Sequence, residues 1–160
     1  MTDFVVGLLA ISFIMLIYTL MWNGIVIRWS QNNKAQSLEE SAIFASESLL
    51  ATAGEPQSFE RADNINTSIR GVGLVNSRNE LSRIKIEKLI ADNSTYTIVK
   101  NRLGLSKYNF GFKVYDLQKN QIYYSYGQFS SGKLNDTVSF DRFAVLDNEA
   151  VIFHMEVFGG

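Results

Sequence analysis

An uninterrupted run of uncharged, mostly apolar residues extends over positions 4–27. At a rise of about 1.5 Å per residue, a helix of this length spans about 36 Å, more than the ~30 Å hydrocarbon core of a bilayer. Trp22 and Trp29 lie near its far end, where indole rings favour a membrane interface. A cleaved signal peptide would need basic residues before a shorter apolar run. The pattern therefore favours a membrane-class helix over residues 3–30.

The helical pattern continues beyond this run, because residues 31–52 contain neither proline nor glycine. Apolar side chains recur there at steps of three and four, as in an amphipathic helix. This stripe consists of Leu38, Ala42, Ala45 and Leu49, and it is widened by Ile43, Phe44 and Leu50. Gly54 and Pro56 then supply a stop signal. We predict one nearly continuous helix over about residues 3–51, apolar all round in its first half and amphipathic in its second.

Short helices and strands follow the first helix. A loop is expected at 57–76, with a short strand near 69–75. Helical patterns begin at 79 and at 94, and the second is closed by Gly104. Strand patterns cover 110–116, 121–126, 138–146 and 150–158, and Asp147-Asn148 suits a tight turn between the last two.

The expected fold class is α+β. A long N-terminal helix would pack its amphipathic half on one face of a small, mainly antiparallel sheet of about four strands, with one or two short helices. The chain would divide into an apolar helix at 3–30 and a globular domain at 31–160 that includes the amphipathic half of the helix.

Composition excludes several classes of function. The 160 residues carry 15 basic and 16 acidic side chains, so the strongly basic surface of a nucleic-acid-binding protein is not expected. The chain has no cysteine, which rules out disulfides and thiolate metal sites. The only histidine, His154, has no acid or nucleophile at motif spacing and is interpreted as structural or surface-exposed. We predict no catalytic residue, metal site or cofactor, and interpret the chain as a non-enzyme.

Two further groups of residues are candidates for binding or modification. Eight aromatic residues between 108 and 129 are interpreted mainly as strand formers that fill a core, with ligand stacking as the alternative. Subunit contact would become the better interpretation if Tyr124 and Tyr126 shared the outer face of the sheet. Asn66, Asn93 and Asn135 begin Asn-x-Ser/Thr sequons and are candidate N-glycosylation acceptors if the domain is extracellular.

Taken together, these parts resemble a type IV pilin. Asp3-Phe4 is similar to the acidic residue and following apolar residue near the start of mature pilins. The stretches LLATAGEP at 49–56 and VGLVNSRNELS at 72–82 resemble archaeal pilin-like surface proteins. Those proteins carry a Leu-Leu-x-Thr-x-Gly-x-Pro element and then a Gly-Leu segment that leads into a helix. The resemblance covers roughly residues 1–105 and implies a pilin-like fold.

The resemblance implies a subunit of an archaeal surface filament, inserted in the membrane before assembly and extracellular afterwards. Its partners would be other copies of itself, with surface glycans as further candidates. Asp3 would pair with a subunit's N-terminal amine, because an unpaired charge in an apolar bundle is costly. The filament core would be packed by Phe4, Val5, Leu8, Leu9, Ile11, Phe13, Ile14, Leu16, Ile17 and Leu20.

One alternative stays open. The chain would then be a single-pass, membrane-anchored binding domain or a minor pilin of a pilus or secretion machine. In that case the helix would remain in lipid and the aromatic strands would bind a partner.

Overall fold

The structure is a computed structural model that describes residues 2–58, 70–117, 121–131 and 137–159, without the side chains of residues 2–6, 10 and 93. The chain divides into two compact units, Met1–Ser37 and Leu38–Gly160, and each is described by itself. The predicted loop at 57–76 lies partly outside the described residues. The short strand predicted near 69–75 is wrong: residues 70–74 form only an isolated bridge between Gly71 and Glu55, and the strand begins at Val75.

The first helix, α1, covers Thr2–Ala51 without interruption. This confirms the prediction of one continuous helix. The described residues of the first unit belong to this helix. The second unit contains its last turns and the strands that the structure describes.

Within the second unit, α1 buries a single stripe of side chains. Leu38, Ala42, Ala45, Leu49 and Leu50 are buried, as predicted. The prediction that Ile43 and Phe44 widen this stripe is wrong, because their side chains are 39% and 64% exposed. At about 100° per residue, position 44 is turned about 200° from position 42, so a helix covered on one side leaves it in solvent.

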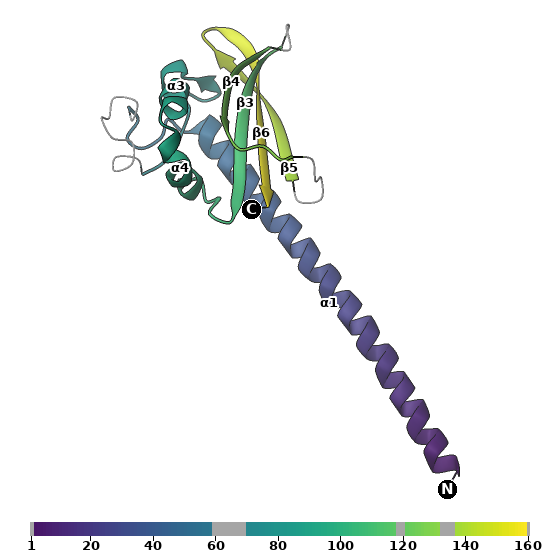
Figure 1. Cartoon of the computed structure of the whole chain (residues 1–160). Helices are drawn as coiled ribbons and strands as arrows, with labels where there is room; N and C mark the ends of the chain where they lie inside the picture. The colour runs from purple at the N-terminus through teal and green to yellow at the C-terminus, as the bar shows by residue number, and fades with distance from the viewer. Residues whose placement is uncertain (1, 59–69, 118–120, 132–136, 160) are drawn as a thin grey trace. The chain divides into compact units, whose positions relative to one another are not determined.

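Within the described residues, the sheet of the second unit has six strands in the order β1-β2-β5-β6-β3-β4. Its four long strands are antiparallel neighbours, as predicted. They cover Tyr108–Asp116 (β3), Ile122–Gly127 (β4), Thr137–Leu146 (β5) and Glu149–Gly159 (β6). Figure 1 shows them side by side. The β5–β6 turn has positive φ angles at Asp147 and Asn148, which two-residue hairpins require.

Two short strands extend the sheet beyond the prediction. They are β1 at Val75–Ser77 and β2 at Glu80–Leu81, and β2 runs parallel to β5. Residues 79–82 were expected to begin a helix, and this boundary is wrong. Asn79 has a φ of 63°, so it forms the turn between β1 and β2 instead of a helical residue.

The helices beyond this turn otherwise follow the prediction. They are α3 at Arg83–Ala91, the 3-10 turn η2 at Asn93–Thr95, and α4 at Tyr96–Arg102. Gly104 follows with a φ of +75°, a conformation that glycine tolerates without a steric cost.

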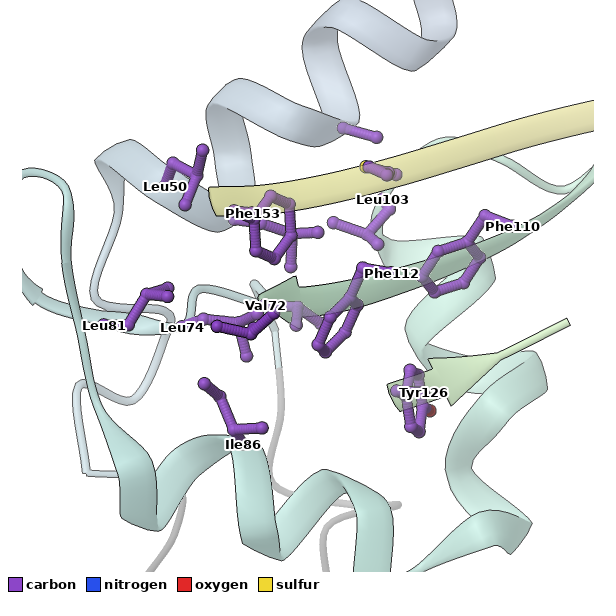
Figure 2. Close-up of a cluster of buried hydrophobic side chains, with 14 of the residues drawn as sticks. Leu50, Val72, Leu74, Leu81, Ile86, Leu103, Phe110, Phe112, Tyr126 and Phe153 are labelled. Carbon is purple, nitrogen blue, oxygen red and sulfur yellow. The ribbon is translucent and has the colours of Figure 1, made fainter. Parts of the chain in front are cut away.

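The core lies between the inner face of the sheet and the helices of the second unit. Figure 2 shows Phe110, Phe112 and Phe153 from the sheet together with Leu50 of α1 and Ile86 of α3. The rings of Phe112 and Phe153 have centroids 5.2 Å apart. This packing confirms that the amphipathic half of α1 is covered by the sheet and the short helices.

Candidate functional site

The apolar segment of α1 exposes its large hydrophobic side chains along the first unit. The predicted filament-core residues with described side chains all have exposed side chains, from 43% exposure for Ile17 to 65% for Ile14. They are Leu8, Leu9, Ile11, Phe13, Ile14, Leu16, Ile17 and Leu20. The helix is long and apolar enough to cross a membrane, by length and composition.

The serine and threonine hydroxyls of residues 8–27 are bonded within the helix itself. Ser12 Oγ donates to the carbonyl oxygen of Leu8 at 2.9 Å, and Thr19 Oγ1 donates to that of Met15 at 2.8 Å. Hydroxyls that bond the carbonyl four residues earlier need no partner outside the helix. The segment can therefore enter apolar surroundings without leaving these hydroxyls unsatisfied.

Several predicted site residues lie at the edge of the described structure or outside it. Asp3, Phe4 and Val5 have helical backbones, but their side chains are outside the described part. Asn66 and Asn135 also fall outside it. The third sequon begins at Asn93, the first residue of η2; its Thr95 is buried and donates a 2.6 Å hydrogen bond to the carbonyl oxygen of Asp92.

The last turn of α1 is joined to the segment that contains β1. The carbonyl oxygens of Leu49 and Leu50 accept hydrogen bonds from the amides of Leu74 and Asn79, at 2.9 and 3.0 Å. Carbonyls at a helix C-terminus have no partner within the helix, so these bonds replace water. The two stretches that carry the pilin resemblance, 49–56 and 72–82, thus bond directly to each other.

Gly73 and Lys85 complete this junction. A β carbon at position 73 would lie 1.9 Å from the carbonyl oxygen of Thr52, so only glycine permits this close approach. The Lys85 side chain is 2% exposed, and its Nζ donates to the carbonyl oxygens of Ala53 and Val75. Sequence reasoning missed Lys85. In the sequence Lys85 is only a lysine next to the apolar residue Ile86. The structure shows that both positions of α3 are buried.

A polar cluster lies on the outer face of the sheet around His154. Its Nδ1 is 2.6 Å from Asp141 Oδ1 on β5, and its Nε2 is 3.3 Å from Glu156 Oε1. Glu156 Oε2 accepts a 3.3 Å hydrogen bond from the amide of Ser130. The register pairs Asp141 with His154, and both are equally distant from the Asp147-Asn148 turn. That symmetry was the signal that could have revealed the pair.

The geometry around His154 is that of a hydrogen-bonded network on a sheet surface. The ring edge meets Tyr115 at a centroid distance of 6.0 Å. Among the described residues, no group of three or more His, Cys, Asp or Glu side chains is arranged to hold a metal ion. We therefore read the cluster as a cross-strand contact between β5 and β6.

The aromatic strands contribute mainly to the core. Phe110, Phe112 and Tyr126 are buried, which confirms the core interpretation for them. Tyr124 and Tyr126 pair with the inward-facing residues Val114 and Phe112, so they share the inner face. The condition that would have favoured subunit contacts through their outer face is therefore not met.

An open cavity of about 240 Å³ lies near the β5–β6 turn. Its polar groups already bond one another: Arg83 pairs with Asp147, and the Tyr124 hydroxyl donates to Glu87 Oε1 at 3.0 Å. Burial and this contact with Glu87 raise the pKa of Tyr124 above 10.0. The cavity is lined by Arg83, Tyr123, Tyr124, Leu146, Asp147 and Glu149.

Comparisons with known protein families, with curated proteins and with solved structures find no match to this chain.

Proposed function

We propose that this chain is a structural subunit of an archaeal type IV pilus-like surface filament. The observation that carries the proposal is the composition of α1. Over 8–27, apart from residue 10, its side chains are mostly apolar and exposed, and the Ser12 and Thr19 hydroxyls bond within the helix. Over 38–50 one stripe of its side chains packs into an α+β core. The resemblance at 49–56 and 72–82 supports the same conclusion.

Assembly is the proposed mechanism. The apolar segment holds the newly made subunit in the membrane, and it then moves from lipid into a bundle of the same segments from other copies. Lipid tails are as apolar as the helix, so the bundle is stabilised by close packing and dispersion. Gly7 and Gly24 carry no β carbon and have open space around them, which suits close helix approach.

The remaining parts have supporting roles in the proposed filament. Asp3 neutralises a subunit's N-terminal amine in the bundle, where an unpaired charge would be costly. The domain faces outward and bears the candidate glycan acceptors Asn66, Asn93 and Asn135. The subunit binds its own copies, the membrane before assembly and candidate surface glycans. It carries out no catalysis and binds no nucleic acid or cofactor.

A second candidate is a single-pass, membrane-anchored binding domain or a minor pilin of a pilus or secretion machine. The cavity near the β5–β6 turn favours it, because two tyrosines and paired charges line an opening large enough for a small group. In this case the apolar helix remains in lipid and the chain functions as a monomer or in small numbers.

Shearing native cells separates the two candidates. The released material is pelleted at high speed, imaged by negative stain, and its subunit identified by mass spectrometry. A filament subunit gives long fibres that contain this chain and persist on dilution. A chain that stays in the membrane fraction and needs detergent to become soluble would overturn the filament proposal and favour the anchored domain.

A further inference from the structure

The sheet of the second unit has a gap along one side of β5. Strand β6 pairs with β5 over its whole length, Thr137–Leu146. On the other side β2 pairs only with Val145 and Leu146. Among the described strands none lies on that side of residues 141–143, and all three of these residues are exposed. A stretch of β5 is therefore an open sheet edge.

One hydrogen bond shows which main-chain groups of β5 face this gap. The amide of Val145 donates to the carbonyl oxygen of Asn79 at 2.8 Å, so the main-chain groups of Val145 point away from β6. Directions alternate along an antiparallel pair, and the β5–β6 register is unbroken. The N–H and C=O groups of Phe143 and Asp141 therefore point to the same side as those of Val145. No described strand pairs with them there.

An open cleft of about 330 Å³ lies at this gap. Its walls come from the last turns of α1, the turn between β1 and β2, and residues 141–143 of β5. Leu50 and Phe143 form its apolar part. Phe143 is 76% exposed, the highest value among the large apolar side chains that the structure describes. The cleft therefore has an accessible aromatic ring, which offers a flat apolar face to a ligand.

The rim of the cleft carries both signs of charge. Glu47 Oε1 and Arg142 Nη2 lie 3.7 Å apart, and Asp141 Oδ1 lies 2.6 Å from His154 Nδ1. Arg78 is exposed and forms no ion pair among the described residues. Each other charged side chain of the rim thus has a partner, and the Arg78 guanidinium is left to bind an anionic group.

We propose that this cleft binds a saccharide that carries a carboxylate. Sugar hydroxyls both donate and accept hydrogen bonds, and the cleft offers main-chain N–H and C=O groups together with carboxylates and guanidinium groups. The C–H face of a sugar ring is apolar and packs on the exposed ring of Phe143. Arg78 holds the carboxylate through two parallel hydrogen bonds, which a planar guanidinium forms readily.

The inference rests on the proposed function in one respect, because it gives a chemical class to the surface glycans among its partners. Binding takes place within one copy and needs no filament. An extended peptide that adds to β5 is the other ligand for an open sheet edge. The saccharide fits better, because only residues 141–143 of β5 line the cleft and main-chain pairing would not use its charged rim.

Saturation-transfer NMR on the detergent-solubilised full-length chain tests the site. The detergent is lauryldimethylamine oxide, whose headgroup contains neither sugar nor phosphate. Methyl β-glucuronide and methyl β-glucoside are the probes, since they differ only in the carboxylate. The glucuronide should bind about tenfold more tightly, with most saturation on the C–H protons of one ring face. Equal affinities would overturn the carboxylate assignment, and binding of neither probe would overturn the site.

Two variants locate the binding in the cleft. Arg78→Gln should weaken glucuronide binding about tenfold and leave glucoside binding unchanged. Phe143→Ser should weaken the binding of both probes about fivefold. Arg102→Gln and Ile84→Ser are the matched controls, because both side chains are exposed but lie on α4 and α3. Unchanged binding in both cleft variants, or equal losses in the controls, would overturn the site.

Two competitors separate the saccharide from other ligands. Sodium acetate supplies a carboxylate alone, and a capped Val-Thr-Val-Thr peptide supplies an extended strand. Neither should displace the glucuronide at equal concentration. Displacement by acetate would leave a simple anion site and displacement by the peptide would favour strand addition, and either would overturn the saccharide.

The same measurements keep the site and the filament function apart. Glucuronide binding by a chain that yields no filaments on shearing would reject the filament function and keep the site. Filaments from a chain that binds neither probe would reject the site and keep the function.

Discussion

Lys85 donates a 2.7 Å hydrogen bond from its buried Nζ to the carbonyl oxygen of Ala53, two residues beyond the end of α1. The same ammonium donates a 2.9 Å bond to the carbonyl oxygen of Val75 in β1. One side chain of α3 thereby joins the end of the long helix to the edge of the sheet. Its removal should loosen this junction between the last turn of α1, β1 and α3.

Lys85→Met should lower the free energy of unfolding of the domain by about 2–4 kcal/mol, because two carbonyl oxygens lose their donor in a dry site. Lys88→Met, on the same helix but only half-buried, should stay within about 0.5 kcal/mol of the wild type. Urea denaturation of the detergent-solubilised chain, monitored by the near-UV circular dichroism of its tyrosines, measures the free energy of unfolding of both variants. Equal midpoints for the two variants would show that the Lys85 bonds contribute no more than a surface lysine.

Gly111→Ala should destabilise the domain by about 1–3 kcal/mol through overpacking. A β carbon there would lie 2.4 Å from the carbonyl oxygen of Gln128 and 2.8 Å from Cζ of Phe129. The segment after β4 would have to move, which would break the bond from Ser130 to Glu156. Gly71→Ala is the control, since its nearest contact would be an ordinary 3.7 Å. Thermal unfolding of both variants measures the difference, and a Gly111→Ala midpoint equal to that of the control would contradict the close packing.

The stability of the domain should fall as the pH rises from about 10 to 12. Burial raises the pKa of Tyr126 from 10.0 to about 12, and the nearby Thr95 hydroxyl offsets only part of the rise. In this window the unfolded chain has lost the phenolic proton while the folded chain retains it. Because the unfolded state then binds fewer protons, the free energy of unfolding falls by about 1.4 kcal/mol per pH unit.

Tyr126→Phe isolates this effect. The variant should show a shallower fall over the same pH window, with a residual slope from Tyr96 and Tyr124, whose pKa values burial also raises. Urea titrations across the window, with phenolate absorbance recorded in parallel, measure both slopes. Parallel slopes for wild type and variant would mean that Tyr126 ionises as it would in water.

Ile14→Asp should abolish filaments, because a carboxylate near the centre of an apolar helix costs about 3 kcal/mol in a bilayer and more in a dry bundle unless it is paired. The free energy of unfolding of the second unit, measured by urea denaturation of the detergent-solubilised chain, should not change, since Ile14 belongs to the first unit. Ile84→Asp is a matched control: Ile84 and Ile14 are both 65% exposed, but Ile84 lies in the domain. Normal filaments from Ile14→Asp would refute a filament core built from this segment.

Local pattern predicted most of the elements, and non-local contacts account for the differences. The long helix, the four long strands and the turn at Asp147-Asn148 all have signals within a few residues. Strands β1 and β2 contain only five residues in total, and β2 is held by a parallel pairing with β5, which is distant in the sequence. No local period marks such strands. The error at Asn79 has the same origin, since its turn matters only once β2 has joined β5.

The width of the buried stripe on α1 also depended on what covers the helix. Ile43 and Phe44 have the composition of core residues, and sequence alone assigned them to the core. Their exposure follows from a partner that covers one side only. The same distinction applies to the candidate site. Composition predicted the apolar segment, whereas the burial of Lys85 depends on packing and the Asp141–His154 contact depends on strand register.

The order of the strands has a consequence for how the protein is made. Strand β6 lies between β5 and β3 and is the last element along the chain. The sheet therefore cannot be completed until nearly all of the chain has left the ribosome. By then about 130 residues have been added after the apolar segment. At roughly 5–20 residues per second this interval is about 7–26 s. The apolar segment of α1 is therefore complete well before the core that its other end joins, so whatever covers this segment has to do so before the core forms.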